Sequence, residues 1–323
     1  MGLLQSLAET RPSSLGVRLL ELVDRRMAEQ VKVAFAPSVY SAYSPISSAV
    51  RVVVTPNDFQ HLHFPENFTK KALRRRAILY DRAMAKADLV IAGSRQTLGD
   101  VDRFYPDKAH LARVLPFPAP ADLRQPTPEE SGQAKGVLGP VSEPIVLYPA
   151  QLWPHKNHLV LLRAVLELQK HWSLPVKLVL TGEGPCGDRI RATAESMGLR
   201  RSVVMCGNVS RGHLFALFKS ADLVVVPSLF EQASYPLMEA GWFDTAVLAS
   251  DIPSLREELQ RFPHALLPPS EPGAWAEAIY RACTNGDERK NLTEAARSVY
   301  SRHDPAKATR GFWDAVTELA NRA

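Results

Sequence analysis

The chain has 323 residues, of which 46% are hydrophobic and 23% are charged, with a formal net charge of +5. This balance excludes disorder as the main state, and the length predicts two domains of roughly 100–200 residues each. No stretch approaches the ~18 uninterrupted apolar residues of a membrane-spanning helix, and the start lacks the pattern of a secretory signal. The three cysteines, Cys186, Cys206 and Cys283, have no metal-type spacing and are typical of thiols in a reducing compartment. The sequence therefore predicts a cytoplasmic protein.

Short apolar segments alternate with segments of helical periodicity along nearly the whole chain. The expected strands lie at 31–36, 50–55, 88–92, 111–115, 145–148, 176–181, 202–206, 222–226, 246–249 and 265–267. The expected helices lie at 14–29, 69–86, 95–104, 156–171, 187–198, 210–220, 236–243 and 272–284, with two more between 289 and 323. Continuous apolar strands that alternate with helices predict the α/β class, with parallel sheets covered on both faces.

A proline-rich segment separates two α/β halves. Residues 116–144 contain seven prolines and no apolar periodicity, which is typical of a linker or hinge. We therefore expect an N-terminal domain at 1–118, a linker at 119–143, a C-terminal domain at 144–303 and a final helix at 304–323.

The positive charge is concentrated in the expected helix at 69–86. Asp81 is its only acid, and its cations are Lys70, Lys71, Arg74, Arg75, Arg76, Arg82 and Lys86. Two interpretations remain open: a solvated helix face, or a contact with an anionic lipid surface at the inner face of the membrane or with an acidic acceptor. A nucleic-acid partner is disfavoured, because aromatic residues are not interleaved with the cations and no recognition motif is present.

Four loops that follow expected strands of the C-terminal half carry unusual residues. They lie at 148–157, 181–185, 206–210 and 227–239. An open parallel sheet binds its ligands beyond the carboxyl ends of the strands, so a binding site is expected here. Gly182 and Gly184 would allow a backbone to approach a flat ligand closely.

The loop at 227–239 is the most informative of the four. Pro236 suits the first position of a helix, and the small or flexible residues 232–234 leave backbone N–H groups free to bind a phosphate. Glu239, in the first turn, would lie within reach of ribose hydroxyls, and Lys156 from a neighbouring loop would neutralise a diphosphate. The alternative is that Glu239 only stabilises its helix and that Glu231 is a solvated loop charge.

The C-terminal half resembles the retaining glycosyltransferases of family 4 (group 1), which have the GT-B fold. The residues that carry the resemblance are Pro154-His-Lys-Asn157, Val179-Leu-Thr-Gly-Glu-Gly184, Gly207-Asn-Val209, Pro227-Ser228, Glu231 and Glu239-Ala240. The N-terminal half is similar to the acceptor side of bacterial members in the segments Asn57–Phe68 and Ala87–Ser94. The resemblance covers about residues 30–300 and implies two Rossmann-like parallel-sheet domains facing a cleft, of which the N-terminal one is reduced. It also implies that the final helix, at 304–323, crosses back onto the N-terminal domain.

The resemblance implies a function and a set of site residues. The protein would transfer a sugar from a nucleotide-diphosphate-sugar, of UDP or GDP type, to a lipid-linked, polysaccharide or small-molecule acceptor, with no metal and no further cofactor. Lys156 and the backbone of 232–235 would bind the diphosphate, Glu239 the ribose and Glu231 the transferred sugar. The implied catalytic residues are Glu231, Lys156, Asn57 and Asp58. The implied donor-binding residues are Gln151, Lys156, Gly182, Glu183, Gly207, Val209, Gln232, Ala233, Ser234, Tyr235 and Glu239.

The sequence also departs from the family pattern. Gln151 stands where the family usually has Arg, residues 232–234 replace a glycine-rich stretch, and Asn57 replaces a frequent His, for which His61 or His63 is an alternative. Only about 30 residues precede the first expected strand, where the family has further βα units. A second hypothesis is therefore a non-catalytic or partner-dependent nucleotide-sugar-binding module. The missing units would leave a sheet edge and one apolar face bare, which predicts a homo-oligomer or a partner subunit.

Overall fold

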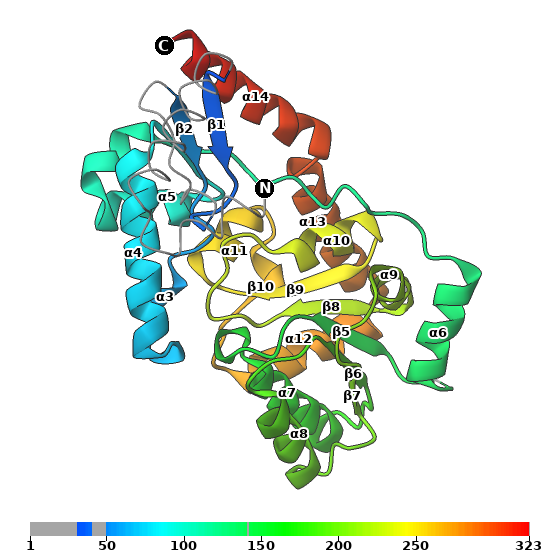
Figure 1. Ribbon diagram of the computed structural model, residues 1–323. Coiled ribbons are helices and arrows are strands. Elements are labelled where there is room, and N and C mark those ends of the chain that lie inside the picture. Colours follow the sequence, from blue (N-terminus) through cyan, green and yellow to red (C-terminus); the bar gives the residue numbers. More distant parts are fainter. Residues whose placement is uncertain (1–30, 41–49, 141, 323) are drawn as a thin grey trace. The chain divides into compact units, whose positions relative to one another are not determined.

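A computed structural model gives the fold of the protein and describes residues 31–40, 50–140 and 142–322. The helix predicted at 14–29 lies outside these residues. The chain divides into two α/β units (Figure 1). Unit 1 contains the residues up to Pro116 and those from Thr309 onward, and unit 2 contains Phe117–Ala308.

Unit 1 is built on a four-stranded parallel sheet in the order β1-β2-β3-β4. Its strands are β1 (Val33–Ala36), β2 (Arg51–Val54), β3 (Leu89–Ala92) and β4 (Ala112–Val114), close to the predicted ranges. The helices that accompany it are α3 (Gln60–His63), α4 (Lys70–Lys86), α5 (Arg95–Phe104) and the 3-10 turns η1 (Pro65–Asn67) and η2 (Pro106–Leu111).

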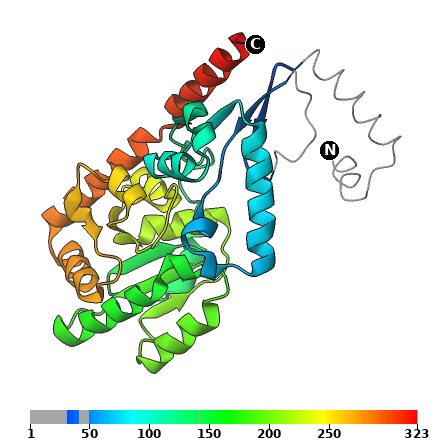
Figure 2. The ribbon, with the colours of Figure 1, turned by 90° about the vertical axis from the view of Figure 1, so that its left-hand side faces the viewer.

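Both faces of this sheet are covered within the chain. Side chains alternate along β2, so Val52 and Val54 pack with α4 and α5 while Val53 faces the other way. Val53 packs with Phe312 and Ala315 of α14 (Pro305–Asn321), the final helix of the chain. Figures 1 and 2 show α4 and α14 on opposite sides of the sheet. The prediction of a bare apolar face is therefore wrong, because the C-terminal helix covers it.

Unit 2 is built on a six-stranded parallel sheet in the order β10-β9-β8-β5-β6-β7. Its strands are β5 (Ile145–Pro149), β6 (Lys177–Thr181), β7 (Val203–Met205), β8 (Leu223–Val226), β9 (Ala246–Ser250) and β10 (Leu266–Leu267). After β5 the chain first adds strands on one side and then returns to add β8 on the other side. The connections from β5 to β6 and from β8 to β9 therefore run to opposite sides of the sheet. Such a switch point is where open parallel sheets bind ligands.

Helices cover both faces of the second sheet. They are α6 (Pro128–Leu138), α7 (His158–His171), α8 (Gly187–Ser196), α9 (Arg211–Ser220), α10 (Tyr235–Trp242), α11 (Pro253–Glu258), α12 (Pro272–Thr284) and α13 (Gly286–Arg302), with 3-10 turns η3 (Pro154–Lys156) and η4 (Pro263–Ala265). Packing pairs α7 with α12 and α10 with α13. The strands β5, β6, β8 and β9 are almost wholly buried between these layers, in agreement with their continuous apolar sequences.

The segment predicted as a linker contains helix α6. The Thr127 hydroxyl accepts a hydrogen bond from the Glu130 N–H at 3.2 Å, and the Glu130 carboxylate accepts one from the Thr127 N–H at 2.7 Å. Ala134 and Leu138 are buried in the core of unit 2. This helix was not among those expected from the sequence. Pro128 occupies its first position, where the missing N–H costs nothing.

Candidate functional site

The predicted donor-binding residues of unit 2 lie in the loops after β5, β6, β7 and β8, at the carboxyl ends of these strands (Figure 1). Parallel strands bring such loops to one edge of the sheet even where they are far apart in sequence. The contacts below show which of the predicted side chains meet there.

Lys156 and Glu231 form the central ion pair. Lys156 ends η3 after β5, Glu231 lies on the loop after β8, and Nζ is 2.5 Å from Oε1. Only 20% of the lysine side chain and 9% of the glutamate side chain are exposed. Ser228 Oγ donates a second hydrogen bond to the same carboxylate oxygen at 2.6 Å. The alternative of a solvated Glu231 is therefore wrong: the carboxylate is buried and held by two donors.

Tyr148 and Asn157 fix the loops that carry this pair. The buried Tyr148 hydroxyl donates to the Lys156 carbonyl at 2.9 Å and lies 3.0 Å from Ser228 Oγ. Burial raises the pKa of Tyr148 well above its ordinary value, so the hydroxyl keeps its proton. Asn157 has a left-handed conformation with φ of 56°, and its Nδ2 donates to the carbonyls of Pro227 (3.0 Å) and Pro269 (2.7 Å). One asparagine thus joins three loops.

Two histidines beside Lys156 are neutral. Burial, helped by the lysine charge, lowers the pKa of His155 and of His158 to about 3. His158 packs against the ring of Tyr148 with 4.7 Å between ring centroids. The positive charge in this loop therefore belongs to Lys156.

Gly182 and Gly184 approach another loop of the chain. A Cβ atom on Gly182 would lie 2.7 Å from the Ala150 carbonyl oxygen, and one on Gly184 would lie 2.6 Å from the Leu152 carbonyl oxygen. Both residues have positive φ, 81° and 157°. The interpretation that these glycines make room for a flat ligand is corrected accordingly: the loop at 150–152 fills the space that they leave.

Gln151 joins the loops after β5, β6 and β7. Its Oε1 accepts a hydrogen bond from the Glu183 N–H at 3.0 Å, and its Nε2 donates to Asn208 Oδ1 at 3.3 Å. The Gly182 N–H donates to the Gly207 carbonyl at 2.7 Å, and Val209 is half-buried just beyond. These predicted residues therefore form one connected layer.

We expect Gln151→Arg to strengthen the binding of a diphosphate, because it adds the charge that the family pattern has at this position. Arg cannot accept the hydrogen bond from Glu183, which costs about 1 kcal/mol. The matched control is Gln151→Met, which loses the same hydrogen bond without adding a charge. Calorimetry with UDP and uridine measures the effect. Equal UDP-over-uridine preferences in the two variants would contradict a position facing the diphosphate.

The start of α10 offers unused hydrogen-bond donors. In the described part of the chain, the backbone N–H groups of Ala233, Ser234 and Tyr235 have no hydrogen-bond partner, and the buried Ser234 hydroxyl has none either. Gln232, beside them, is half-buried. Free N–H groups at a helix start bind anions, and the helix dipole adds to the attraction.

Glu239 lies deeper than predicted. It is the fifth residue of α10, and Pro236 is the second, so the prediction of a first-turn acid after a first-position proline is wrong by one residue. Glu239 is 4% exposed, and its Oε1 accepts a hydrogen bond from Arg211 NH1 at 2.6 Å. Burial raises the pKa of Glu239, and the Arg211 charge opposes this shift. Sequence reasoning missed Arg211, whose only signal was a cation directly after the cap of α9.

Asn57 and Asp58 belong to unit 1. The Asp58 carboxylate accepts hydrogen bonds from Arg76 at 2.6 Å and from the Gln60 N–H at 2.9 Å. These two bonds connect the loop of Asp58 to α4 and to the start of α3. His61 is buried against Tyr80, and burial lowers its pKa to about 4. His63 Nε2 lies 2.8 Å from Asp100 Oδ1, whereas Asn57 is exposed.

Within residues 31–40, 50–140 and 142–322, no group of three or more His, Cys, Asp or Glu side chains is arranged to hold a metal ion. None of the helices in these ranges combines the length and the apolar character needed to cross a membrane.

The fold is that of the GT-B glycosyltransferases. It is similar to a sucrose-phosphate synthase from Thermosynechococcus elongatus (TM-score 0.74, 20% identity, 99% of this chain and 80% of that chain). It is also similar to HepE of Anabaena in complex with UDP (TM-score 0.76, 19% identity, 96% of this chain and 85% of that chain). The family model of the glycosyl transferases group 1 matches residues 133–299, more than half of the chain. The chain belongs to this family.

Curated relatives agree with this assignment. A D-inositol 3-phosphate glycosyltransferase of Actinosynnema mirum is 30% identical over 256 residues, which are 76% of this chain and 59% of the relative. A protein of the same name from Corynebacterium urealyticum is 26% identical over 251 residues, which are 74% of this chain and 57% of the relative. The matched region thus spans less than two thirds of the length of these relatives.

Proposed function

We propose that the protein is a retaining glycosyltransferase that takes a sugar from a UDP- or GDP-sugar and passes it to a lipid-linked, polysaccharide or small-molecule acceptor. The observation that carries the proposal is the buried Lys156–Glu231 pair at the switch point of the second sheet. The unused N–H groups at the start of α10 support it. HepE was solved with UDP and with UDP-glucose, and the relatives above are named glycosyltransferases.

The candidate site residues of unit 2 have separate roles in this proposed reaction. An acceptor hydroxyl attacks the anomeric carbon from the side of the leaving group, the bond from that carbon to the diphosphate oxygen breaks, and the hydroxyl proton passes to the diphosphate. Lys156 and the N–H groups of 233–235 stabilise the charge that develops on the diphosphate. Glu231 holds hydroxyls of the sugar, and Glu239 holds the ribose. Gln151, Glu183, Gly207 and Val209 line the nucleoside side.

Thermal unfolding in the presence of UDP, GDP, ADP and their sugars tests the proposal. A ligand that binds only the native state at 100 times its Kd adds about 2.7 kcal/mol of stability. We expect UDP or GDP to raise the melting temperature and ADP to have no effect. No stabilisation by any nucleotide would contradict the proposal. Release of free sugar from the stabilising donor separates a transferase from a module that only binds nucleotide-sugar.

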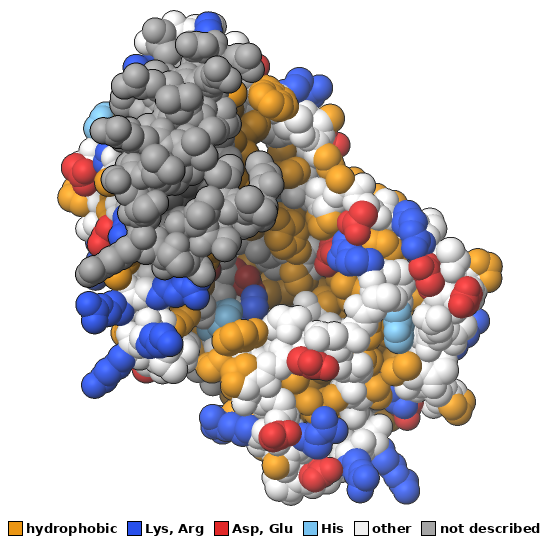
Figure 3. All heavy atoms as spheres, in the orientation of Figure 1, with side chains coloured by type: hydrophobic (Ala, Val, Ile, Leu, Met, Phe, Trp, Pro, Cys, Tyr) orange, Lys and Arg blue, Asp and Glu red, His pale blue; other side chains and the backbone are white. Residues whose placement is uncertain are grey.

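We also propose that α4 contacts an anionic membrane surface. Its buried face carries Tyr80, Ala83 and Met84, and the opposite face is basic. Ile78 is 43% exposed on that basic face. Figure 3 shows Lys and Arg side chains gathered at one end of this helix. Of the cations, Lys70, Lys71, Arg74 and Arg75 form no ion pair within the described residues. Unpaired cations around an exposed apolar side chain suit an interfacial helix better than a solvated one.

Sedimentation with lipid vesicles tests this contact. We expect the protein to sediment with vesicles that contain phosphatidylglycerol and not with pure phosphatidylcholine. Replacing Lys71 and Arg74 by Gln removes about 1 kcal/mol for each charge, so binding should weaken by about 30-fold. The double variant Arg189→Gln/Arg191→Gln, on the exposed surface of α8, is the charge-matched control. Equal binding by the control and the Lys71→Gln/Arg74→Gln variant would favour the solvated-face interpretation.

A further inference from the structure

Glu239 is a buried carboxylate that depends on one cation. Taking a carboxylate out of water favours its neutral form, and hydrogen bonds from a nearby positive charge oppose that preference. The guanidinium of Arg211 is that charge, with NH1 2.6 Å from Oε1. Oε2 accepts no hydrogen bond from the described residues. One carboxylate oxygen is therefore fixed by the arginine, and the other remains available to an incoming hydroxyl.

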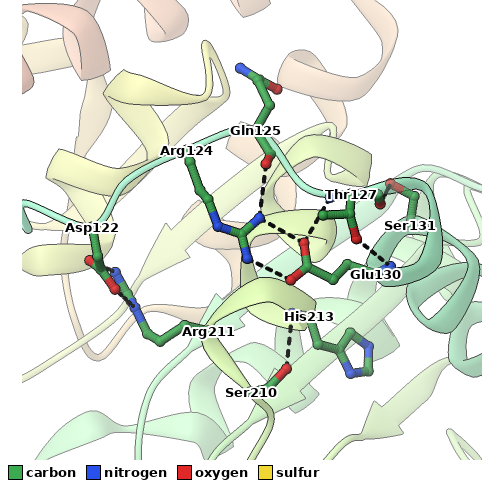
Figure 4. Close-up of polar contacts among 9 residues, drawn as sticks. All are labelled: Asp122, Arg124, Gln125, Thr127, Glu130, Ser131, Ser210, Arg211 and His213. Carbon is green, nitrogen blue, oxygen red and sulfur yellow. Dashed lines mark hydrogen bonds and ion pairs between the residues drawn. The ribbon is translucent and has the colours of Figure 1, made fainter.

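Arg211 is itself held from three sides. Its Nε and NH2 donate to the two carboxylate oxygens of Asp122, each at 2.9 Å (Figure 4). The hydrogen bond from Arg211 lowers the pKa of Asp122, so this carboxylate stays charged. The guanidinium also lies over the ring of Phe215, with 4.7 Å from Cζ to the ring centroid. Each of the three guanidinium nitrogens thus donates to a carboxylate oxygen, and the ring limits movement in the remaining direction.

The segment that carries Asp122 is fixed against the same helix. Figure 4 shows Arg124 directed at Glu130, with hydrogen bonds of 2.6 and 2.9 Å. Arg124 lies over Phe215 as well, 5.6 Å from the ring centroid. A Cβ atom on Gly212 would lie 1.7 Å from Glu130 Oε1, so the starts of α6 and α9 are in close contact. Asp122 therefore belongs to a rigid support for Arg211.

We propose that Arg211 is a positioning residue that holds Glu239 ionised and oriented to accept hydrogen bonds from the ribose hydroxyls of a nucleoside diphosphate, with Asp122 holding Arg211 in place. The proposal rests on the proposed function. It adds to that function a residue, Arg211, that determines the specificity for ribonucleotides. Arg211 does not touch the nucleotide and acts on it only through Glu239.

The test compares UDP with 2′,3′-dideoxy-UDP, which lacks the hydroxyls that Glu239 would bind. We expect the wild-type chain to prefer UDP by tenfold or more in calorimetry. Arg211→Met should reduce this preference to less than threefold while the affinity for dideoxy-UDP stays within threefold of wild type. Asp122→Asn should reduce it partly, and Arg211→Lys should restore part of it. Arg297→Met is the control, since it removes an exposed arginine that is paired with Asp244 at 2.6 Å.

The double variant Arg211→Met/Glu239→Gln keeps the test valid if Arg211→Met does not fold. It leaves no unpaired buried carboxylate, and we expect it to show no more loss of preference than Glu239→Gln alone. A folded Arg211→Met that keeps the full preference for UDP would overturn the role of Arg211. The role of Arg211 would also be overturned if the losses of UDP preference in Arg211→Met and in Glu239→Gln added up in the double variant. If the wild-type chain binds neither UDP nor GDP, the proposed function fails instead.

Discussion

Glu231→Gln is expected to lower the rate of sugar transfer by about 10²–10³-fold while UDP binds as well as before. The replacement keeps the shape of the side chain and removes its charge. Contacts between Glu231 and the transferred sugar count mainly in the transition state, whereas the nucleotide does not touch this residue in the proposed mechanism. Glutamine can still accept a hydrogen bond from Lys156 but does not neutralise the lysine charge that is now paired at 2.5 Å. That charge becomes fully available to the diphosphate, so UDP affinity should hold or rise.

Glu239→Gln is the matched control, because it changes the same type of side chain on the same loop and helix. It should weaken UDP binding by about 1–3 kcal/mol, the value of a hydrogen bond to a charged group. Steady-state rates with the donor identified by thermal unfolding, together with calorimetry of UDP, measure both effects. Equal losses of UDP affinity in the two variants would contradict the separation of roles.

The strands were predictable because buried strands consist almost entirely of apolar residues, which are visible in the sequence. In β5 and β8 almost every side chain is buried, and short continuous apolar runs between helical segments are typical of buried parallel strands. The helices α6 and α11 were not predicted because neither shows a clear apolar periodicity. In α6 only Ala134 and Leu138 are buried, and α11 has only six residues. Their first residues, Pro128 and Pro253, suit the first turn of a helix.

The site residues were predictable where the chemistry of the ligand requires one particular type of side chain in a loop. Lys156 and Glu231 are such a case, since a diphosphate needs a cation and the two loops meet at the switch point. Arg211 and Asp122 could not be found, because their meaning depends on contacts between α9 and a segment 89 residues away in sequence. The glycines at 182 and 184 misled for a similar reason: sequence shows that space is needed, and only the fold shows what fills it.

The faces and the edges of the four-stranded sheet bear on the predicted self-association of the chain. The final helix covers one face of the four-stranded sheet and α4 and α5 cover the other, so a bare face gives no reason for self-association. The strand β1 pairs with β2 alone among the described strands. Self-association through that edge stays a prediction, which light scattering at low micromolar concentration can check.

Gly241→Ala is expected to destabilise unit 2 by about 3 kcal/mol, although the same substitution in a helix usually stabilises. Gly241 lies in α10 where this helix crosses α13. A Cβ atom there would lie 2.2 Å from the Ala296 carbonyl oxygen and 2.8 Å from the Tyr300 Cβ atom. Both obstacles are close to the backbone of α13, so neither can rotate away. Because α10 also carries Glu239, UDP affinity should fall along with stability.

Gly136→Ala supplies the control for this prediction. Gly136 lies in α6, and a Cβ atom there would have no neighbour within 4 Å. This variant should be more stable than wild type by about 0.5–1 kcal/mol, because alanine loses less backbone freedom on helix formation than glycine. Urea unfolding curves of the three proteins measure both shifts. A Gly241→Ala midpoint equal to that of Gly136→Ala would mean that α10 and α13 are not in the close contact described, and the rigid placement of Glu239 would lose its support.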